Sequence, residues 1–241
     1  MTPQRSTSTE LEQVWASSRD EEVAIGLGSL TLHGRLTVPD HCVGMVIFAH
    51  GSGSSRHSPR NTEVADELRT VGLGTLLFDL LTESEEEDRS NVFDVELLAE
   101  RLAEVTHWLR GRPGLAMLPV GYFGASTGAA AALWAAATPR LRIAAVVSRG
   151  GRVDLARDRL AEVSAPTLLI VGGYDEVVLD LNRRAAAELT CEHELRVIPG
   201  ASHLFAEGDA LRTVSIMARD WFLAHRHPNG VHQGGAGWAM P

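Results

Sequence analysis

Hydrophobic and polar positions follow two different patterns along this chain of 241 residues. Residues 22–28 and 30–38 alternate apolar and polar side chains, which predicts an antiparallel pair of strands with one buried face. From Val43 onward the strand-length apolar runs are nearly continuous, as in parallel strands that are buried on both faces. These runs are Val43–Ala49, Leu73–Leu80, Leu118–Phe123, Ile143–Ser148, Thr167–Val171 and Glu194–Ile198.

Segments with helical periodicity separate the apolar runs. Alternating strands and helices predict an α/β fold: a mostly parallel, doubly wound sheet of about eight strands with helices on both faces. We expect a single domain over residues 21–225, a flexible leader over residues 1–20 and a flexible, glycine-rich tail over residues 226–241. The expected helices are about Asn61–Val71, Phe93–Leu109, Ser126–Ala136, Val177–Leu189 and Asp209–Ala224.

Composition narrows the function classes. The net charge of −9 argues against nucleic-acid or anionic-membrane partners. All 22 basic residues are arginine, which excludes Schiff-base chemistry, lysine-anchored pyridoxal phosphate and a Walker lysine, and we expect no cofactor. The two cysteines, Cys42 and Cys191, have no disulfide or zinc pattern, so we interpret them as buried free thiols. With no apolar run near the ~20 residues of a membrane span and no signal core in residues 1–20, we expect a cytoplasmic protein.

The segment Gly124-Ala125-Ser126-Thr127-Gly128 follows an apolar run and precedes an alanine-rich stretch. The pattern G-x-S-x-G between a strand and a helix is typical of a nucleophile elbow, where the serine hydroxyl stands clear of the sheet on strained backbone. Small residues must flank such a serine to avoid collisions. Two other interpretations exist: the glycines let a helix pack close to a strand, or they form a dinucleotide-binding loop, which belongs at the first strand–helix turn of its fold.

Polar residues follow the predicted strands at one edge of the sheet, where open parallel sheets bind ligands. Ser126 follows the fifth strand, Asp175 the seventh and His203 the eighth. We expect these three residues to act as nucleophile, acid and base. His203 takes the proton of the Ser126 hydroxyl, while Asp175 holds the imidazole in the right tautomer. The alternative is that Asp175 caps a helix and His203 is a surface residue.

Several residues compete for the roles of acid and base. Glu176 neighbours Asp175, and Asp180 falls in the following helix. The other histidines are less suited to act as the base. His193 lies at the wrong edge of the sheet, and His50 precedes the serine. His225 and His227 lie beyond the last helix, and His57 lies in a loop near the opening of the site. The irregular histidines of the tail give little reason to expect a metal site.

Acyl transfer also needs hydrogen-bond donors for the developing oxyanion. The elbow supplies the Thr127 backbone N–H, and the glycine-rich loop after the third strand supplies a second one. We expect the Ser52 N–H to be this donor, with Gly51 or Gly53 as alternatives one residue away.

Two sets of charged residues lie near the predicted mouth, the opening of the site at the edge of the sheet where the strands end. The acidic residues 83–88 lead into a helix, which we interpret as a solvated helix approach rather than a metal or substrate site. The arginines either bind a substrate carboxylate or phosphate or pair with the acidic loop. We favour the pairing for the set and expect only Arg149 to face the site and bind substrate; the set is Arg56, Arg60, Arg149 and Arg152.

Four segments resemble the dienelactone hydrolase-like group of the α/β-hydrolases, and the resemblance extends from about Glu22 to Ala224. It implies the α/β-hydrolase fold, the triad Ser126, Asp175 and His203, and Ser52 and Thr127 as oxyanion donors. Dienelactone hydrolases carry cysteine where Ser126 stands, so the dienelactone substrate does not follow. The segments are Phe-Ala-His-Gly-Ser-Gly-Ser-Ser-Arg (48–56), Phe-Gly-Ala-Ser-Thr-Gly (123–128), Val-Gly-Gly-Tyr-Asp (171–175) and Ala-Ser-His-Leu-Phe (201–205).

The connection after the sixth strand, residues 149–165, is too short for the lid domain that many such relatives insert there. We therefore predict an open site and a serine hydrolase that cleaves a small soluble carboxylic ester, thioester or lactone through an acyl-enzyme on Ser126. The alternatives are an acyltransferase using the same acyl-enzyme and a non-catalytic ligand-binding protein on the same fold. The sequence predicts no oligomeric state.

Overall fold

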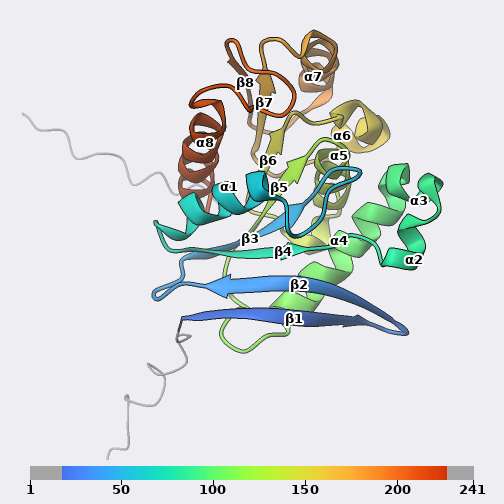
Figure 1. Ribbon diagram of the computed structural model, residues 1–241, viewed down its shortest axis with the longest axis vertical. Helices are drawn as coiled ribbons and strands as arrows, with labels where there is room; N and C mark the ends of the chain where they lie inside the picture. The colour runs from blue at the N-terminus through green and yellow to red at the C-terminus, as the bar shows by residue number, and fades with distance from the viewer. Residues whose placement is uncertain (1–17, 227–241) are drawn as a thin grey trace, which may run out of the picture.

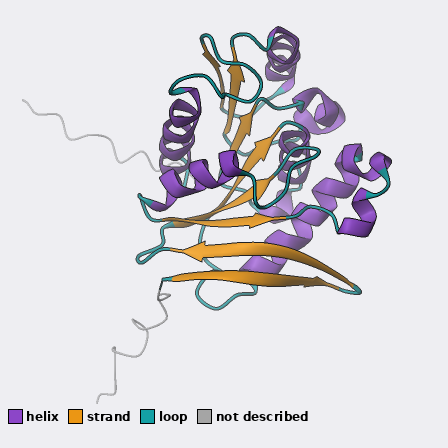
Figure 2. Ribbon diagram, viewed as in Figure 1, coloured by secondary structure: helices purple, strands orange, loops and turns teal. Residues whose placement is uncertain are grey.

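The computed structural model describes residues 18–226, which form an eight-stranded sheet in the order β1-β2-β4-β3-β5-β6-β7-β8 (Figures 1 and 2). The pairs β1–β2 and β2–β4 are antiparallel, and the other neighbours are parallel. The strands are β1 (Arg19–Leu27), β2 (Leu30–Val38), β3 (Gly44–Ala49), β4 (Leu73–Phe78), β5 (Val120–Ala125), β6 (Val146–Arg149), β7 (Thr167–Gly172) and β8 (His193–Ile198).

Helices cover both faces of the sheet, as predicted (Figure 1). On one face lie α1 (Pro59–Arg69) and α8 (Ala210–Ala224); on the other lie α4 (Val95–Arg110), α5 (Thr127–Ala136) and α7 (Glu176–Glu188). Short helices complete the described chain: α2 (Glu83–Glu86), α3 (Arg89–Phe93), η1 (Pro139–Leu141), η2 (Val153–Ala156) and α6 (Arg157–Leu160).

The core consists of two apolar layers, one on each face of the sheet. Phe48 and Phe123 pack with Phe222 under α1 and α8, whereas Tyr122 packs with Leu102 under α4. Every residue of β3, β4, β5, β6 and β7 is buried, which explains why these strands have continuous apolar runs in the sequence.

Two of the element boundaries that differ from the prediction are set by polar side chains, which show no apolar pattern in the sequence. Strand β1 begins at Arg19, where Asp20 forms an ion pair with Arg35 of β2 at 2.6 Å, so two residues of the expected leader belong to the sheet. Helix α1 begins two residues early because Ser58 accepts a hydrogen bond from the Asn61 N–H and Pro59 occupies the first turn. Residues 1–17 and 227–241 lie outside the described range.

The connection between β6 and β7 contains only η2 and α6, so the fold has no lid domain at this position. The acidic segment forms α2, whose N-terminus is closed by reciprocal hydrogen bonds between Thr82 and Glu85. Glu85 also pairs with Arg101 of α4 at 2.9 Å. Within residues 18–226, no helix combines the length and the hydropathy of a membrane span.

Candidate active site

Ser126 occupies a strained turn between β5 and α5. Its φ of 51° and ψ of −121° lie in a region that residues with a side chain rarely adopt, at a cost of about 1–3 kcal/mol. Neighbouring backbone holds the turn: the Ser126 N–H donates to the Arg149 carbonyl at 3.2 Å, and the Arg152 N–H donates to the Ser126 carbonyl at 3.0 Å. The serine thus stands between the ends of two neighbouring strands.

The glycines around Ser126 allow close backbone approach. A Cβ atom on Gly124 would lie 2.4 Å from the Ala129 Cα, and one on Gly128 would lie 2.1 Å from the Ala49 carbonyl oxygen. A Cβ on Gly51, in the loop after β3, would lie 3.0 Å from the Ser126 Cβ. The G-x-S-x-G pattern therefore has a steric cause on both sides of the serine.

We expect Gly128→Ala to destabilise the fold by about 3 kcal/mol or more, because the rigid backbone at Ala49 cannot yield to a methyl group. Gly26→Ala is the matched control, since nothing lies within 4 Å of the added Cβ there. Urea unfolding followed by circular dichroism measures both changes. Equal stability of the two variants would contradict the close approach at Gly128.

His203 and Asp175 form a hydrogen-bonded pair. The imidazole Nδ1 lies 2.6 Å from Asp175 Oδ2, with the histidine in the loop after β8 and the aspartate after β7. The Asp175 side chain makes no capping bond to α7, which rules out the helix-cap alternative. Because a carboxylate accepts the Nδ1–H, Nε2 is left as the proton acceptor. Of the rival acids, Glu176 begins α7 and Asp180 pairs with Arg184 at 2.5 Å.

The backbone brings this pair beside the elbow. Gly150 follows Arg149, whose carbonyl accepts the Ser126 N–H, and a Cβ on Gly150 would lie 3.4 Å from His203 Nδ1. Among the described residues, no hydrogen bond joins the Ser126 hydroxyl to His203. Such contacts commonly tighten only when substrate binds. Ser126, Asp175 and His203 thus lie at one edge of the sheet, while their catalytic roles stay predictions.

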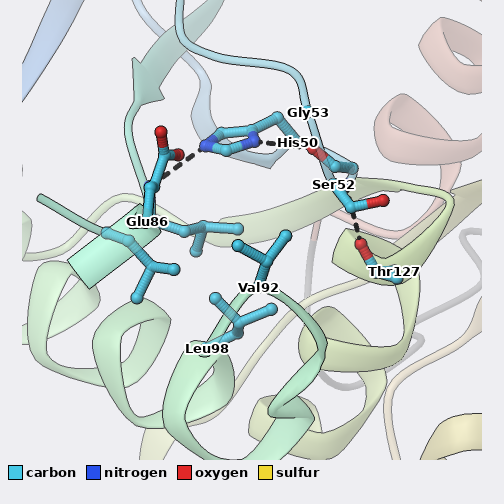
Figure 3. A pocket seen from close by; sticks show the side chains of 10 residues that line it. His50, Ser52, Gly53, Glu86, Val92, Leu98 and Thr127 are labelled. Atoms are coloured by element: carbon cyan, nitrogen blue, oxygen red, sulfur yellow. Dashed lines mark hydrogen bonds between the residues drawn. The ribbon is translucent and has the colours of Figure 1, made fainter. Parts of the chain in front are cut away.

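His50 fixes the loop that carries the expected oxyanion donor (Figure 3). Its buried ring accepts the Leu80 N–H at Nε2 over 3.1 Å, so Nδ1 carries the proton and donates to the Gly51 carbonyl over 3.0 Å. In a trans peptide the N–H points opposite to the carbonyl, which turns the Ser52 N–H toward α5. This role could not be predicted from the sequence, because both hydrogen-bond partners of the ring are backbone groups.

The Ser52 N–H donates to Thr127 Oγ1 at 2.9 Å (Figure 3). An amide has a single hydrogen, so the Thr127 hydroxyl must rotate away before Ser52 can bind an oxyanion. As the first residue of α5, Thr127 has a backbone N–H without an acceptor inside the helix. Both oxyanion donors remain predictions. The Ser52 N–H can serve as a donor only after the Thr127 hydroxyl has rotated away.

A small crevice lies next to the oxyanion loop on the α4 face of the sheet (Figure 3). Its volume of about 230 Å³ includes open solvent, and the enclosed part has room for about one water molecule. Most of its side chains are apolar, and Glu86 of α2 is the acid among them; the apolar ones are Leu80, Leu81, Val92 and Leu98. The crevice is thus no substrate pocket.

The interpretation that the mouth arginines pair with the acidic loop is wrong for the described residues. Arg56 pairs with Asp79, which directly follows β4, and Arg152 pairs with Asp154 two residues away in η2. Glu85 of the acidic segment instead reaches Arg101, since α2 packs beside α4.

Arg149, the last residue of β6, is 8% exposed and forms no ion pair with a described residue. Burial, with a smaller contribution from Arg60, lowers the pKa of Arg149 to about 10. The guanidinium therefore remains charged at neutral pH in a buried setting.

The comparisons with known proteins point to hydrolases. No model of a known protein family matches the chain. The crystal structure of a dienelactone hydrolase from Anabaena variabilis is 50% identical, with a TM-score of 0.84 over 87% of this chain and 99% of the other. An α/β serine hydrolase without lid from Xanthomonas campestris, 22% identical, has a TM-score of 0.68 over 84% of this chain and 94% of its own, and shows the shared fold.

A curated protein of Mycobacterium tuberculosis, named "Putative phosphoribosyl transferase", is 60% identical over 207 residues. The match covers 86% of this chain but 47% of that protein. The chain thus spans about half the length of this curated relative.

Proposed function

The chain belongs to the dienelactone hydrolase family of α/β-hydrolases, and we propose that it cleaves a small ester, thioester or lactone through an acyl-enzyme on Ser126. Similarity to hydrolases supports a hydrolase-type function. The observation that carries the finer proposal is the 2.6 Å contact between His203 and Asp175 at the edge where Ser126 lies half-buried on strained backbone. A serine hydroxyl needs such an oriented base to become a nucleophile.

In the first half of the proposed reaction, Ser126 Oγ attacks the substrate carbonyl carbon while His203 Nε2 takes its proton. Asp175 stabilises the imidazolium that results. The oxyanion receives hydrogen bonds from the Thr127 N–H and, after the Thr127 hydroxyl rotates, from the Ser52 N–H. Collapse of this intermediate breaks the bond to the leaving alcohol or thiol, which receives the proton from His203.

In the second half, His203 takes a proton from water as the water oxygen attacks the acyl carbonyl. The second tetrahedral intermediate collapses, the acid leaves, and Ser126 regains its proton from His203. Because the described connection between β6 and β7 forms no lid domain over this edge, we expect water to reach the acyl-enzyme, which favours hydrolysis over transfer to another acceptor. Retention of the His203–Asp175 pair beside the strained serine weighs against the non-catalytic alternative.

The name of the Mycobacterium tuberculosis relative belongs to a protein about twice as long. More than half of that protein has no counterpart in the matched segment, so its name gives no reason to assign phosphoribosyl transfer to the site around Ser126.

Mass spectrometry during turnover of p-nitrophenyl acetate tests the proposal. We expect one acetyl group to appear on the peptide that contains Ser126 and to disappear as the ester is consumed. An added alcohol that captured the acetyl group in preference to water would favour the acyltransferase alternative. Steady turnover with no acetylated Ser126 would overturn the acyl-enzyme.

A further inference from the structure

Arg149 differs from five other arginines that are partly removed from solvent. Arg56, Arg69, Arg101, Arg152 and Arg219 each pair with an aspartate or glutamate. Arg149 is more deeply buried than any of these five, yet its Nη1 has no hydrogen-bond partner and no described acid pairs with it. A buried charge without a counter-charge is strongly unfavourable.

Besides burial, a second cation acts on Arg149. Arg60, in the first turn of α1, lowers the pKa of the Arg149 guanidinium by repulsion, and the Arg60 Nε is itself buried without a partner. No acid occupies that first turn. The backbone N–H groups at the N-terminus of this 11-residue helix add further positive potential. An anion bound between these groups would supply the missing counter-charge and so remove the unfavourable free energy of the unpaired positive charges.

This cluster lies beside the catalytic edge. The Arg149 carbonyl accepts the Ser126 N–H at 3.2 Å, and the next residue, Gly150, packs against His203. Side chains alternate along a strand, so Arg149 points to the same face as Val147, whose apolar layer lies under α1 and α8. Arg60 belongs to α1 on this same face.

We propose that Arg149 and Arg60 form an anion-binding subsite, which selects substrates with a carboxylate or phosphate group close to the bond that Ser126 cleaves. The anionic end of the substrate then lies on the face of the sheet that α1 covers. The guanidinium fork binds both kinds of oxyanion through paired hydrogen bonds. The selection of substrates rests on the proposed function, whereas anion binding by Arg149 and Arg60 requires no catalysis.

Anion binding to the Ser126→Ala protein provides a test that needs no turnover. We expect succinate or inorganic phosphate to raise the melting temperature in a saturable manner, and the stronger of the two to identify the anion class. Arg149→Met should abolish this rise and, by removing the unpaired charge, should raise the melting temperature without anion. Arg60→Met, at a less buried position, should weaken the rise. Arg140→Met, an exposed arginine in η1 before β6, is the matched control.

The outcomes separate a ligand site from a structural arginine. If Arg149→Met lowers the melting temperature and leaves the effect of both anions intact, Arg149 is structural and the proposal fails. If neither anion stabilises the Ser126→Ala protein, the proposal also fails, whatever the enzyme hydrolyses.

Substrate preference tests the catalytic half in the enzyme with Ser126 intact. p-Nitrophenyl hemisuccinate and p-nitrophenyl butyrate have similar acyl chains that end in a carboxylate and a methyl group. We expect the ratio of their kcat/KM values to fall by about 10- to 100-fold in Arg149→Met, the range for loss of a hydrogen bond to a charged group. An unchanged ratio would overturn selection by this subsite. Absence of turnover on both esters would instead count against the hydrolase proposal and leave the binding result as it stands.

Discussion

Replacement of Ser126 by alanine is expected to lower kcat for ester hydrolysis by about 10⁴-fold or more, because it removes the nucleophilic hydroxyl of the proposed mechanism. The folded structure should persist, since the Ser126 backbone N–H and carbonyl carry the contacts that hold the turn. Steady-state kinetics with a p-nitrophenyl ester measures the loss. Ser164→Ala, at an exposed serine just before β7, is the control and should retain full activity.

The same position offers a test of stored strain. Ser126→Gly should lose activity to the same extent but stabilise the fold by about 1 kcal/mol, because glycine adopts a φ of 51° without a steric penalty. Urea unfolding of the alanine and glycine variants gives the difference directly. A glycine variant no more stable than the alanine variant would show that the turn is not strained, and a kcat in either variant close to that of the unmodified enzyme would contradict the nucleophile assignment.

The second large effect concerns Asp175. Asp175→Asn keeps the shape of the side chain but places an amide donor opposite His203 Nδ1, which favours the tautomer with its proton on Nε2. That tautomer cannot take the Ser126 proton, so we expect kcat to fall by about 10³- to 10⁴-fold.

Glu176→Gln is the matched control for Asp175→Asn, because it makes the same chemical change one residue away at the start of α7. Its kcat should remain close to that of the unmodified enzyme. Equal losses in both variants would point to disruption of α7, and full activity in Asp175→Asn would remove Asp175 from the mechanism.

The central sheet could be predicted from the sequence because its parallel strands are buried on both faces, and such strands consist of uninterrupted apolar residues. The positions of Ser126, Asp175 and His203 followed from the same pattern, since each residue lies in the turn or loop that follows a predicted strand. Fold topology then brings these strand ends to one edge.

Features that depend on polar contacts over long separations could not be predicted. His50 binds the Leu80 N–H, 30 residues away, and only the folded chain shows that the ring is buried. The partner of Glu85 is Arg101 rather than a mouth arginine, because the packing of α2 on α4 decides it. Residues 83–93 form two short helices without buried residues, so no apolar periodicity marks them.

Labelling with a fluorophosphonate, followed by peptide mass mapping, is the decisive experiment for the serine hydrolase proposal, because this probe reacts with a serine only when a neighbouring base activates it. We expect the unmodified protein to be labelled on Ser126 and His203→Ala, though folded, to remain unlabelled. Labelling of Ser126 that persists in His203→Ala would contradict the base assignment. A folded protein that is not labelled at all would contradict the serine hydrolase and favour a ligand-binding protein on this fold.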